Sequence, residues 1–358
     1  MVGLGGFEPP TSPLSGVRSN QLSYRPLGRP NAGHPAEGAY YTHSRVIYKR
    51  CRMIKSTHPE FERMARGETV PASDLLLGFL EEAGVPHETL LDGVRLPEDL
   101  ELLDPSRILS YGSPGYVDLE IHRIIGSTND TVMQRLGNAH CQAVLCAAEM
   151  QTAGRGRRGR NWVSPFGRNI YVTYGRFLQR KLSELGGLSI LVGMQAVDVL
   201  RDMGLEDVGL KWPNDILFQG GKLGGILVEL KSQESRGIGI AAGTGINFLL
   251  SETDATHIDQ AWSAIGHRAT ISRNQFLDDF SRKLIAAFEI FNSDGFLPFG
   301  EAWSDYDVYQ GQTLRVKRGE SWFEGVNEGI DREGNLLIRG ADGIEVHNAG
   351  EVSMRPVL

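Results

Sequence analysis

Residues 151–162, Gln-Thr-Ala-Gly-Arg-Gly-Arg-Arg-Gly-Arg-Asn-Trp, limit the fold more than any other stretch of this chain. They contain three glycines, four arginines and no acidic residue, although the whole chain has a net charge of −7. Glycine lets backbone N–H groups approach a ligand closely, and arginine offers planar, permanently charged donors. The stretch is typical of a loop that closes over a small anion. A solvated basic loop, or a segment that binds RNA nonspecifically, explains the composition equally well.

The glycines of this loop also match the spacing G-x-G-x-x-G, at Gly154, Gly156 and Gly159. A dinucleotide site requires a helix after that fingerprint, so that the pyrophosphate rests on the helix N-terminus. Here Pro165 interrupts the residues that follow, and residues 169–174 are β-branched and aromatic, as in a strand. No Lys-Ser or Lys-Thr pair follows the last glycine. The sequence therefore argues against both a Rossmann site and a P-loop.

Composition narrows the class of protein. The chain has 358 residues, 41% hydrophobic and 23% charged, which suits a soluble protein of two or three domains. Its net charge gives no overall attraction for nucleic acid or anionic membranes, and we expect no apolar run long enough to cross a bilayer. The spacing of Cys141 and Cys146 matches no metal or redox motif, so we expect buried structural thiols and no metal site. This cysteine usage fits a cytoplasmic location.

The first part of the chain differs from the rest. Residues 1–52 hold seven basic residues against two acidic ones, without a secretory apolar segment. We expect them to be disordered, or to be an extension created by a start codon assigned too early, with the natural chain beginning at Met53. Residues 53–116 form a small acidic lead-in, with one expected helix that Ser73 or Asp74 can cap.

Residues 117–309 alternate between strand-like and helix-like patterns. Expected strands lie at residues 117–122, 142–149, 169–174, 208–212, 216–218, 222–230 and 237–242. Expected helices begin at Ser127 or Thr128 and otherwise span residues 182–203, 271–291 and 298–306. This order predicts an α+β catalytic domain, with a mixed or antiparallel sheet flanked by helices, rather than regular βαβ units.

Residues 310–358 change pattern again. Short strand-like runs, separated by glycine and aspartate turn signals, lie at residues 313–317, 322–326, 335–339 and 344–347. They predict a small C-terminal SH3-like β-barrel.

Three further motifs offer groups suited to an anionic ligand. Lys211 lies at a strand end, where it can stabilise charge on a phosphoryl oxygen, or can be a surface lysine before an ordinary turn. Gly225 permits close backbone approach, or marks a bulge. Asn247 offers a carboxamide at a glycine-flanked bend, or caps a turn.

The motifs occur together and in a fixed order. They are Ser127-Thr-Asn129, residues 151–160 with Trp162, Lys211-Trp-Pro-Asn-Asp215, Lys222-Leu-Gly-Gly-Ile-Leu-Val-Glu229 and Gly243-Thr-Gly-Ile-Asn247. In combination they resemble the biotin protein ligase family, also called biotin-[acetyl-CoA-carboxylase] ligase, from about Ile121 onward. The resemblance implies a class II synthetase-like biotin/lipoate ligase fold.

The resemblance also implies a reaction. Biotin and ATP, with Mg²⁺, form biotinyl-5'-AMP and pyrophosphate, and the biotinyl group then passes to a lysine on the biotin carboxyl carrier protein of acetyl-CoA carboxylase. A homodimer is compatible with the resemblance. Because biotin's carboxylate is ionised near neutral pH, the first step needs cations and positioning rather than a general base.

Particular residues inherit roles from this resemblance. Contacts to biotin fall to Ser127, Thr128, Asn129, Gln151, Arg155, Gly156, Arg157, Lys211 and Gly225. Contacts to ATP or the adenylate fall to Arg155, Arg157, Arg158, Trp162, Asn214 and Asn247, with Trp162 near the adenine. Arg157 and Lys211 are the expected catalytic residues, and the loop is expected to order over the ligand and exclude water.

Two alternatives belong to other function classes. One branch of the family carries a DNA-binding helix-turn-helix and acts as a biotin-operon repressor. Between Glu68 and Asp104 this chain has one basic residue, Arg95, against ten acidic ones, so we expect no DNA binding and a branch without a clear DNA-binding domain. Residues 53–95 can still be a shrunken remnant of such a domain. The second alternative is a lipoate-protein ligase, which shares the fold.

Overall fold

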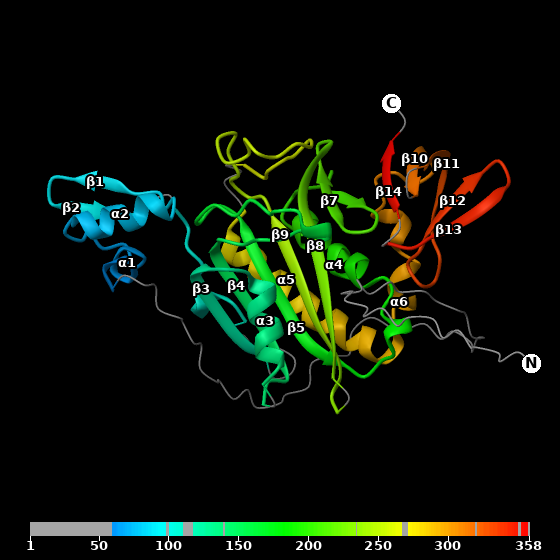
Figure 1. Cartoon of the computed structure of the whole chain (residues 1–358), viewed down its shortest axis with the longest axis horizontal. Coiled ribbons are helices and arrows are strands. Elements are labelled where there is room, and N and C mark those ends of the chain that lie inside the picture. Colours follow the sequence, from blue (N-terminus) through cyan, green and yellow to red (C-terminus); the bar gives the residue numbers. More distant parts are fainter. Residues whose placement is uncertain are drawn as a thin grey trace, which may run out of the picture.

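The computed structural model describes residues 59–97, 100–109, 117–138, 140–233, 235–266, 271–318, 321–349 and 352–356. They form a small N-terminal module, a central domain built on a seven-stranded sheet, and a C-terminal module of five strands (Figure 1). The extension expected at residues 1–52 lies outside the described residues.

The N-terminal module folds around a small apolar cluster. Its elements are α1 (Pro59–Met64), α2 (Asp74–Glu82) and the antiparallel hairpin of β1 (Glu88–Leu90) and β2 (Gly93–Arg95). α2 is the helix expected from the sequence, and the Ser73 hydroxyl caps it by accepting a hydrogen bond from the Leu76 N–H at 3.3 Å. Phe61 and Leu80 are buried in one cluster with Phe166 of the central domain, so the two units pack together.

The central sheet is mixed, with strand order β3-β4-β5-β9-β8-β7-β6. Its strands are β3 (Asp118–Ile125), β4 (Ala143–Gln151), β5 (Ile170–Leu178), β6 (Gly209–Lys211), β7 (Asp215–Phe218), β8 (Gly221–Gln233) and β9 (Gly237–Ile246). β3 and β4 run parallel, and the other neighbours run antiparallel. The parallel pair needs a crossover connection, which the helix between β3 and β4 supplies. The expected α+β class with a mixed sheet is confirmed.

Helices cover both faces of this sheet (Figure 1). α3 (Thr128–Leu136) packs against β4, β5 and β9 on one face. α4 (Leu188–Asp202) and α5 (Arg273–Asp294) pack against each other and bury the main apolar core on the opposite face. Alternating residues of β4 therefore belong to two different clusters, Val144 and Cys146 under α3, and Leu145 and Ala147 under α4 and α5.

The long helix expected at residues 182–203 is shorter than predicted. Residues Leu182–Glu184 form a 3₁₀ turn, and α4 begins only at Leu188, because Gly187 adopts a left-handed φ of 74°. Contrary to the expectation from the sequence, the segment Leu182–Asp202 is long and apolar enough to cross a membrane, by length and composition alone. Since 61% of its most apolar 18-residue window is buried inside the protein, the burial of a core helix explains this composition.

The prediction of one helix at residues 298–306 is also wrong. The segment divides into α6 (Leu297–Gly300) and a 3₁₀ turn at Trp303–Asp305. The buried indole of Trp303 belongs to the main core. Apolar residues at helical spacing here reflect two short turns that pack on the core rather than one continuous helix.

The C-terminal module is an antiparallel sheet with the order β13-β12-β11-β10-β14. Its strands are β10 (Thr313–Arg318), β11 (Ser321–Ile330), β12 (Leu336–Gly340), β13 (Gly343–His347) and β14 (Val352–Pro356). The first four correspond to the expected strands. β14 was not expected, because five residues that end in proline carry little alternation until they pair with β10.

Candidate active site

A cavity of about 480 Å³ opens beside the glycine–arginine loop, a volume that suits a small-molecule ligand. Its walls come from the start of α3, the loop, the β6–β7 turn and the strands β8 and β9. Among the residues expected to bind ligand, the cavity is lined by Ser127, Thr128, Asn129, Gln151, Arg155, Gly156, Arg157, Arg158, Trp162, Lys211, Asn214 and Gly225. The structure thus brings Arg157 and Lys211 to one cavity, from a loop and a strand that are far apart in sequence.

The loop folds back on itself as a tight hairpin. The Gly156 N–H donates to the Arg160 carbonyl at 2.7 Å, and the Trp162 N–H donates to the Gly154 carbonyl at 2.9 Å. Arg158 at the tip has a left-handed φ of 56°. That conformation costs a non-glycine residue about 1–2 kcal/mol. The hairpin orients the arginines toward the cavity at the expense of local backbone strain.

Arg155 is held by acidic neighbours. Its two terminal nitrogens bind both Asp130 oxygens at 2.7 and 2.6 Å, and one of them also lies 3.4 Å from a Glu229 oxygen. The Asp130 hydrogen bond raises the pKa of Arg155 above its ordinary value, and Arg155 in turn lowers the pKa of Asp130. Glu229 also accepts a hydrogen bond from Asn129 at 2.7 Å. The charge of Arg155 is therefore shared with two carboxylates, which the sequence did not indicate.

Arg157 joins three parts of the molecule. Its Nη1 donates to the Asn214 side-chain oxygen at 2.7 Å, and its Nη2 donates to the Ala349 carbonyl of the C-terminal module. Burial lowers the pKa of Arg157 from its ordinary value, and the nearby Arg158 lowers it further. Within the described part of the chain, Arg157 thus bonds an amide oxygen and a carbonyl oxygen, whereas Arg155 bonds carboxylates. The charge of Arg157 is the better placed to meet an anionic ligand.

Lys222 is a further cation of this site, and no role for it was predicted from the sequence. Its Nζ lies 2.7 Å from an Asp215 oxygen and 5.6 Å from the ring centroid of Trp162. Like Lys211, it lines the main cavity. Its place at the start of the Lys222-Leu-Gly-Gly motif was the signal that could have identified it.

A buried hydrogen-bond network supports the opposite end of the cavity. The Thr128 N–H and hydroxyl donate to the Gln151 side-chain oxygen at 2.9 and 3.1 Å. Thr173 is fully buried on β5, and its hydroxyl donates to the Asn129 side-chain oxygen at 2.6 Å. Thr173 was missed, since a threonine inside a β-branched run reads simply as a strand residue. The network fixes the polar groups assigned to biotin.

Two glycines of the Gly-Thr-Gly motif make room for Asn129 of this network and for the ring of Trp162. A Cβ on Gly243 would lie 2.1 Å from the Asn129 side-chain oxygen, and a Cβ on Gly245 would lie 2.5 Å from the Trp162 ring. Both glycines are therefore required by close approach. Asn247 instead lines a smaller neighbouring cavity, where its amide donates to the Ser263 carbonyl at 3.1 Å. The structure places Asn247 as a support of the wall rather than in the main cavity.

Comparison with known proteins agrees with this architecture. A model described as the Biotin/lipoate A/B protein ligase family matches residues 122–247, and one described as the Biotin protein ligase C terminal domain matches residues 310–355. The Bifunctional ligase/repressor BirA of Salmonella typhimurium is 36% identical over 264 residues, which are 74% of this chain and 82% of that protein. The Biotin--[acetyl-CoA-carboxylase] ligase of Paracoccus denitrificans is 31% identical over 237 residues, 63% of this chain and 96% of that protein.

A solved structure has the same fold. The biotin protein ligase from Aquifex aeolicus in complex with biotin and ATP superimposes with a TM-score of 0.56, over 67% of this chain and 99% of that chain. The two sequences are 24% identical, so this likeness supports the fold alone.

Proposed function

This chain belongs to the biotin protein ligase family, and we propose that it passes activated biotin to a lysine on a carrier protein. It is an ATP-dependent biotin–[acetyl-CoA-carboxylase] ligase that forms biotinyl-5'-AMP. The proposed acceptor is the biotin carboxyl carrier domain of acetyl-CoA carboxylase, in line with the name of the Paracoccus relative.

In the first step, the biotin carboxylate attacks the α-phosphorus of ATP and pyrophosphate leaves. Two anions must approach each other, so the site has to neutralise charge and hold both groups in line. Lys211 and Arg157 line the cavity where these groups would meet, and we assign both to the developing charge. Magnesium would enter with the triphosphate, and Asp259 is an acidic residue of the cavity wall suited to hold it.

In the second step, the amine of the acceptor lysine attacks the acyl carbon and AMP leaves. The amine must be neutral, and Asp215 lies in the cavity where it could orient or accept a proton from it. Its ion pair with Lys222 at 2.7 Å positions the Asp215 carboxylate. The Arg157 bond to the C-terminal module would hold the loop over the adenylate and limit its hydrolysis.

The convergence of Arg157 and Lys211 on one cavity is the observation that supports these assignments most directly. Lys211→Ala should slow biotin-dependent exchange of pyrophosphate into ATP at least about tenfold, because one charge-stabilising group is lost. Lys283→Ala is a matched control, since that lysine pairs with Asp202 on the helical surface. An exchange rate for Lys211→Ala equal to that of the control would remove Lys211 from the proposal.

The choice between biotin and lipoate is tested by titration calorimetry. In the presence of a non-hydrolysable ATP analogue, titration of biotin should give a measurable heat of binding. Titration of lipoate at the same concentration should give none. The network of Thr128, Asn129 and Gln151 offers several polar groups to a ureido ring, and a dithiolane ring has no comparable donors. Preferential binding of lipoate would overturn the assignment.

The relatives named as bifunctional repressors raise DNA binding as a second function. In this chain α2 and the β1–β2 hairpin carry Asp74, Glu81, Glu82 and Glu88. Such a surface repels the phosphate backbone, so we propose a ligase without operator binding. A gel shift at low salt, with and without biotin and ATP, tests this. A specific shift that depends on biotin and ATP would show that the module retains the second function.

A further inference from the structure

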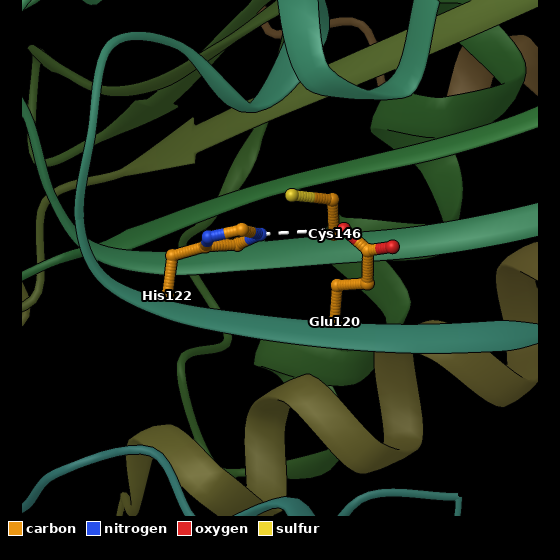
Figure 2. A group of neighbouring side chains, drawn as sticks. All are labelled: Glu120, His122 and Cys146. Carbon is orange, nitrogen blue, oxygen red and sulfur yellow. Dashed lines mark hydrogen bonds and ion pairs between the residues drawn. The ribbon is translucent and has the colours of Figure 1, made fainter. Parts of the chain in front are cut away.

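A second group of reactive side chains lies away from the cavity, under α3. Glu120 and His122 on β3 and Cys146 on β4 point toward one another (Figure 2). The exposed fractions are 5%, 3% and 0%, respectively. One oxygen, nitrogen or sulfur atom from each residue lies within 4.8 Å of the other two. None of the three residues lines the active-site cavity.

The strand register explains how these residues meet. Glu120 and His122 are two positions apart on β3 and therefore share one face of the sheet. Cys146 is the register partner of Glu120 on the parallel neighbour β4, so its side chain lies on that same face. His122 pairs with Ala148, whose small side chain leaves space beside the imidazole. α3 then covers the group.

We propose that Glu120, His122 and Cys146 form a binding site for a divalent zinc-type ion. Thiolate sulfur and imidazole nitrogen are ligands for borderline metals and poor ligands for magnesium, so the site differs from the one that would serve ATP. A water molecule would be the fourth ligand of the ion.

The spacing of His122 and Glu120 suits two ligands of a tetrahedral ion. The His122 Nε2 and a Glu120 oxygen are 3.4 Å apart. Two ligands each about 2.1 Å from a tetrahedral zinc ion are separated by about 3.4 Å. The other Glu120 oxygen lies 2.7 Å from Arg135 of α3, an outer contact that would orient the carboxylate.

The charges also balance. Asp118 lies 3.3 Å from Arg135, so two carboxylates accompany one guanidinium at this place. A dication that displaces the Cys146 proton adds one net positive charge and offsets the surplus carboxylate.

Binding of a metal by these residues would affect the edge of the central sheet. β3 is an edge strand that pairs only with β4 among the described strands, and it leads directly into Ser127 and Thr128 of the cavity. A metal held by two residues of β3 and one of β4 would fasten this edge. Metal binding should therefore raise the melting temperature of the folded chain.

Cobalt is the most direct probe, because a thiolate bound to cobalt gives a charge-transfer band in the near ultraviolet. The chain has three cysteines, so a Cys51→Ser, Cys141→Ser variant leaves Cys146 as the sole thiol. This variant should bind one equivalent of cobalt with that band, and zinc should displace it. Absence of the band in the folded variant would overturn the proposal.

Substitutions in the otherwise unaltered chain give an independent test. Cys146→Ser should abolish the band and the zinc-dependent rise in melting temperature, whereas Cys141→Ser, another buried thiol, should keep both. His122→Gln and Glu120→Gln should weaken zinc binding at least about tenfold, the loss typical of even an outer-shell partner. A zinc-dependent rise that is equal in Cys146→Ser and the unaltered chain would contradict the site.

Discussion

The two modules attached to the central domain make contact with it in different ways. The N-terminal module and the segment after it meet the central domain through the apolar cluster with Phe166 and through acidic side chains that bind buried arginines and the start of α5. The C-terminal module instead reaches the active site, since Ala349 accepts a hydrogen bond from Arg157 and Gly334 accepts one from Trp212. The first attachment is expected to serve stability, and the second is expected to serve ligand binding as well.

The acidic attachment centres on Glu149, which is fully buried on β4. Its oxygens accept hydrogen bonds from Arg273 at 2.8 Å, from Arg123 at 3.3 Å and from the Leu103 N–H at 2.5 Å. Arg123 also lies 3.8 Å from Glu62 of α1. A buried ion network of this kind is costly to break, because one partner is left charged without compensation.

The largest expected effect therefore follows from Glu149→Gln. It should lower the free energy of unfolding by about 3–5 kcal/mol, since Arg273 and Arg123 lose their buried counter-ion. Chemical denaturation measures this, with Glu289→Gln as control, whose carboxylate pairs with Arg176 but is 53% exposed. Equal stability losses in both variants would mean that burial does not set the strength of this attachment.

Trp212→Phe tests the C-terminal attachment. The Trp212 Nε1–H donates to the Gly334 carbonyl at 3.0 Å inside the protein. Its loss leaves a buried acceptor unsatisfied and should cost about 1–3 kcal/mol of stability. Because Trp212 follows Lys211 on the cavity wall, affinity for ATP should fall as well, measured by calorimetry. Trp322→Phe, on the exposed part of the same module, should leave both quantities unchanged.

Arg157→Ala should separate catalysis from stability. The variant loses the bonds to Asn214 and to Ala349, so the loop should release the adenylate early and label the carrier about tenfold more slowly. Labelling of a carrier domain and free biotinyl-5'-AMP are measured together. Arg339→Ala, which removes an exposed ion pair with Glu328 in the C-terminal module, is the control. Unchanged labelling by the Arg157 variant would refute the role of the loop.

The smallest effect concerns the acid limit of stability. Burial alone would raise the pKa of Glu101, but hydrogen bonds from Ser272, Asn274 and the Arg273 N–H lower it below its ordinary value. A carboxyl whose pKa is lowered by folding stabilises the protein above its unfolded pKa, about 4.3. That contribution disappears as the pH falls through the folded pKa.

In the Glu101→Gln variant, the free energy of unfolding should therefore fall less steeply as the pH is lowered through the acid range. Its dependence on pH near neutrality should stay the same. Denaturation midpoints measured from neutral pH down to about pH 3 test this. Glu88→Gln is the comparison, because Glu88 forms a partly exposed pair with Arg95 in the β1–β2 hairpin. An identical pH profile for Glu101→Gln and the unaltered chain would contradict the expectation.

The sequence by itself determined the α+β order, most strands of the two larger sheets, and many of the residues that line the main cavity. These features are local: a strand follows from alternation, and a phosphate-seeking loop follows from the spacing of glycines and arginines. Arg155, Arg157, Trp162 and Lys211 could be named because their motifs carry the chemistry within a few residues.

Only the tertiary structure decided which of these arginines form ion pairs with carboxylates. It also decided which residues of different strands come into contact. The pairing of Arg155 with Asp130 and Glu229, the place of Asn247 behind the wall, and the burial of Glu149 between two arginines all depend on contacts through space. Glu120, His122 and Cys146 match no sequence spacing, because the register of β3 on β4 brings them together. Strand pairing sets such contacts, and a linear pattern carries no record of which strand will lie beside which.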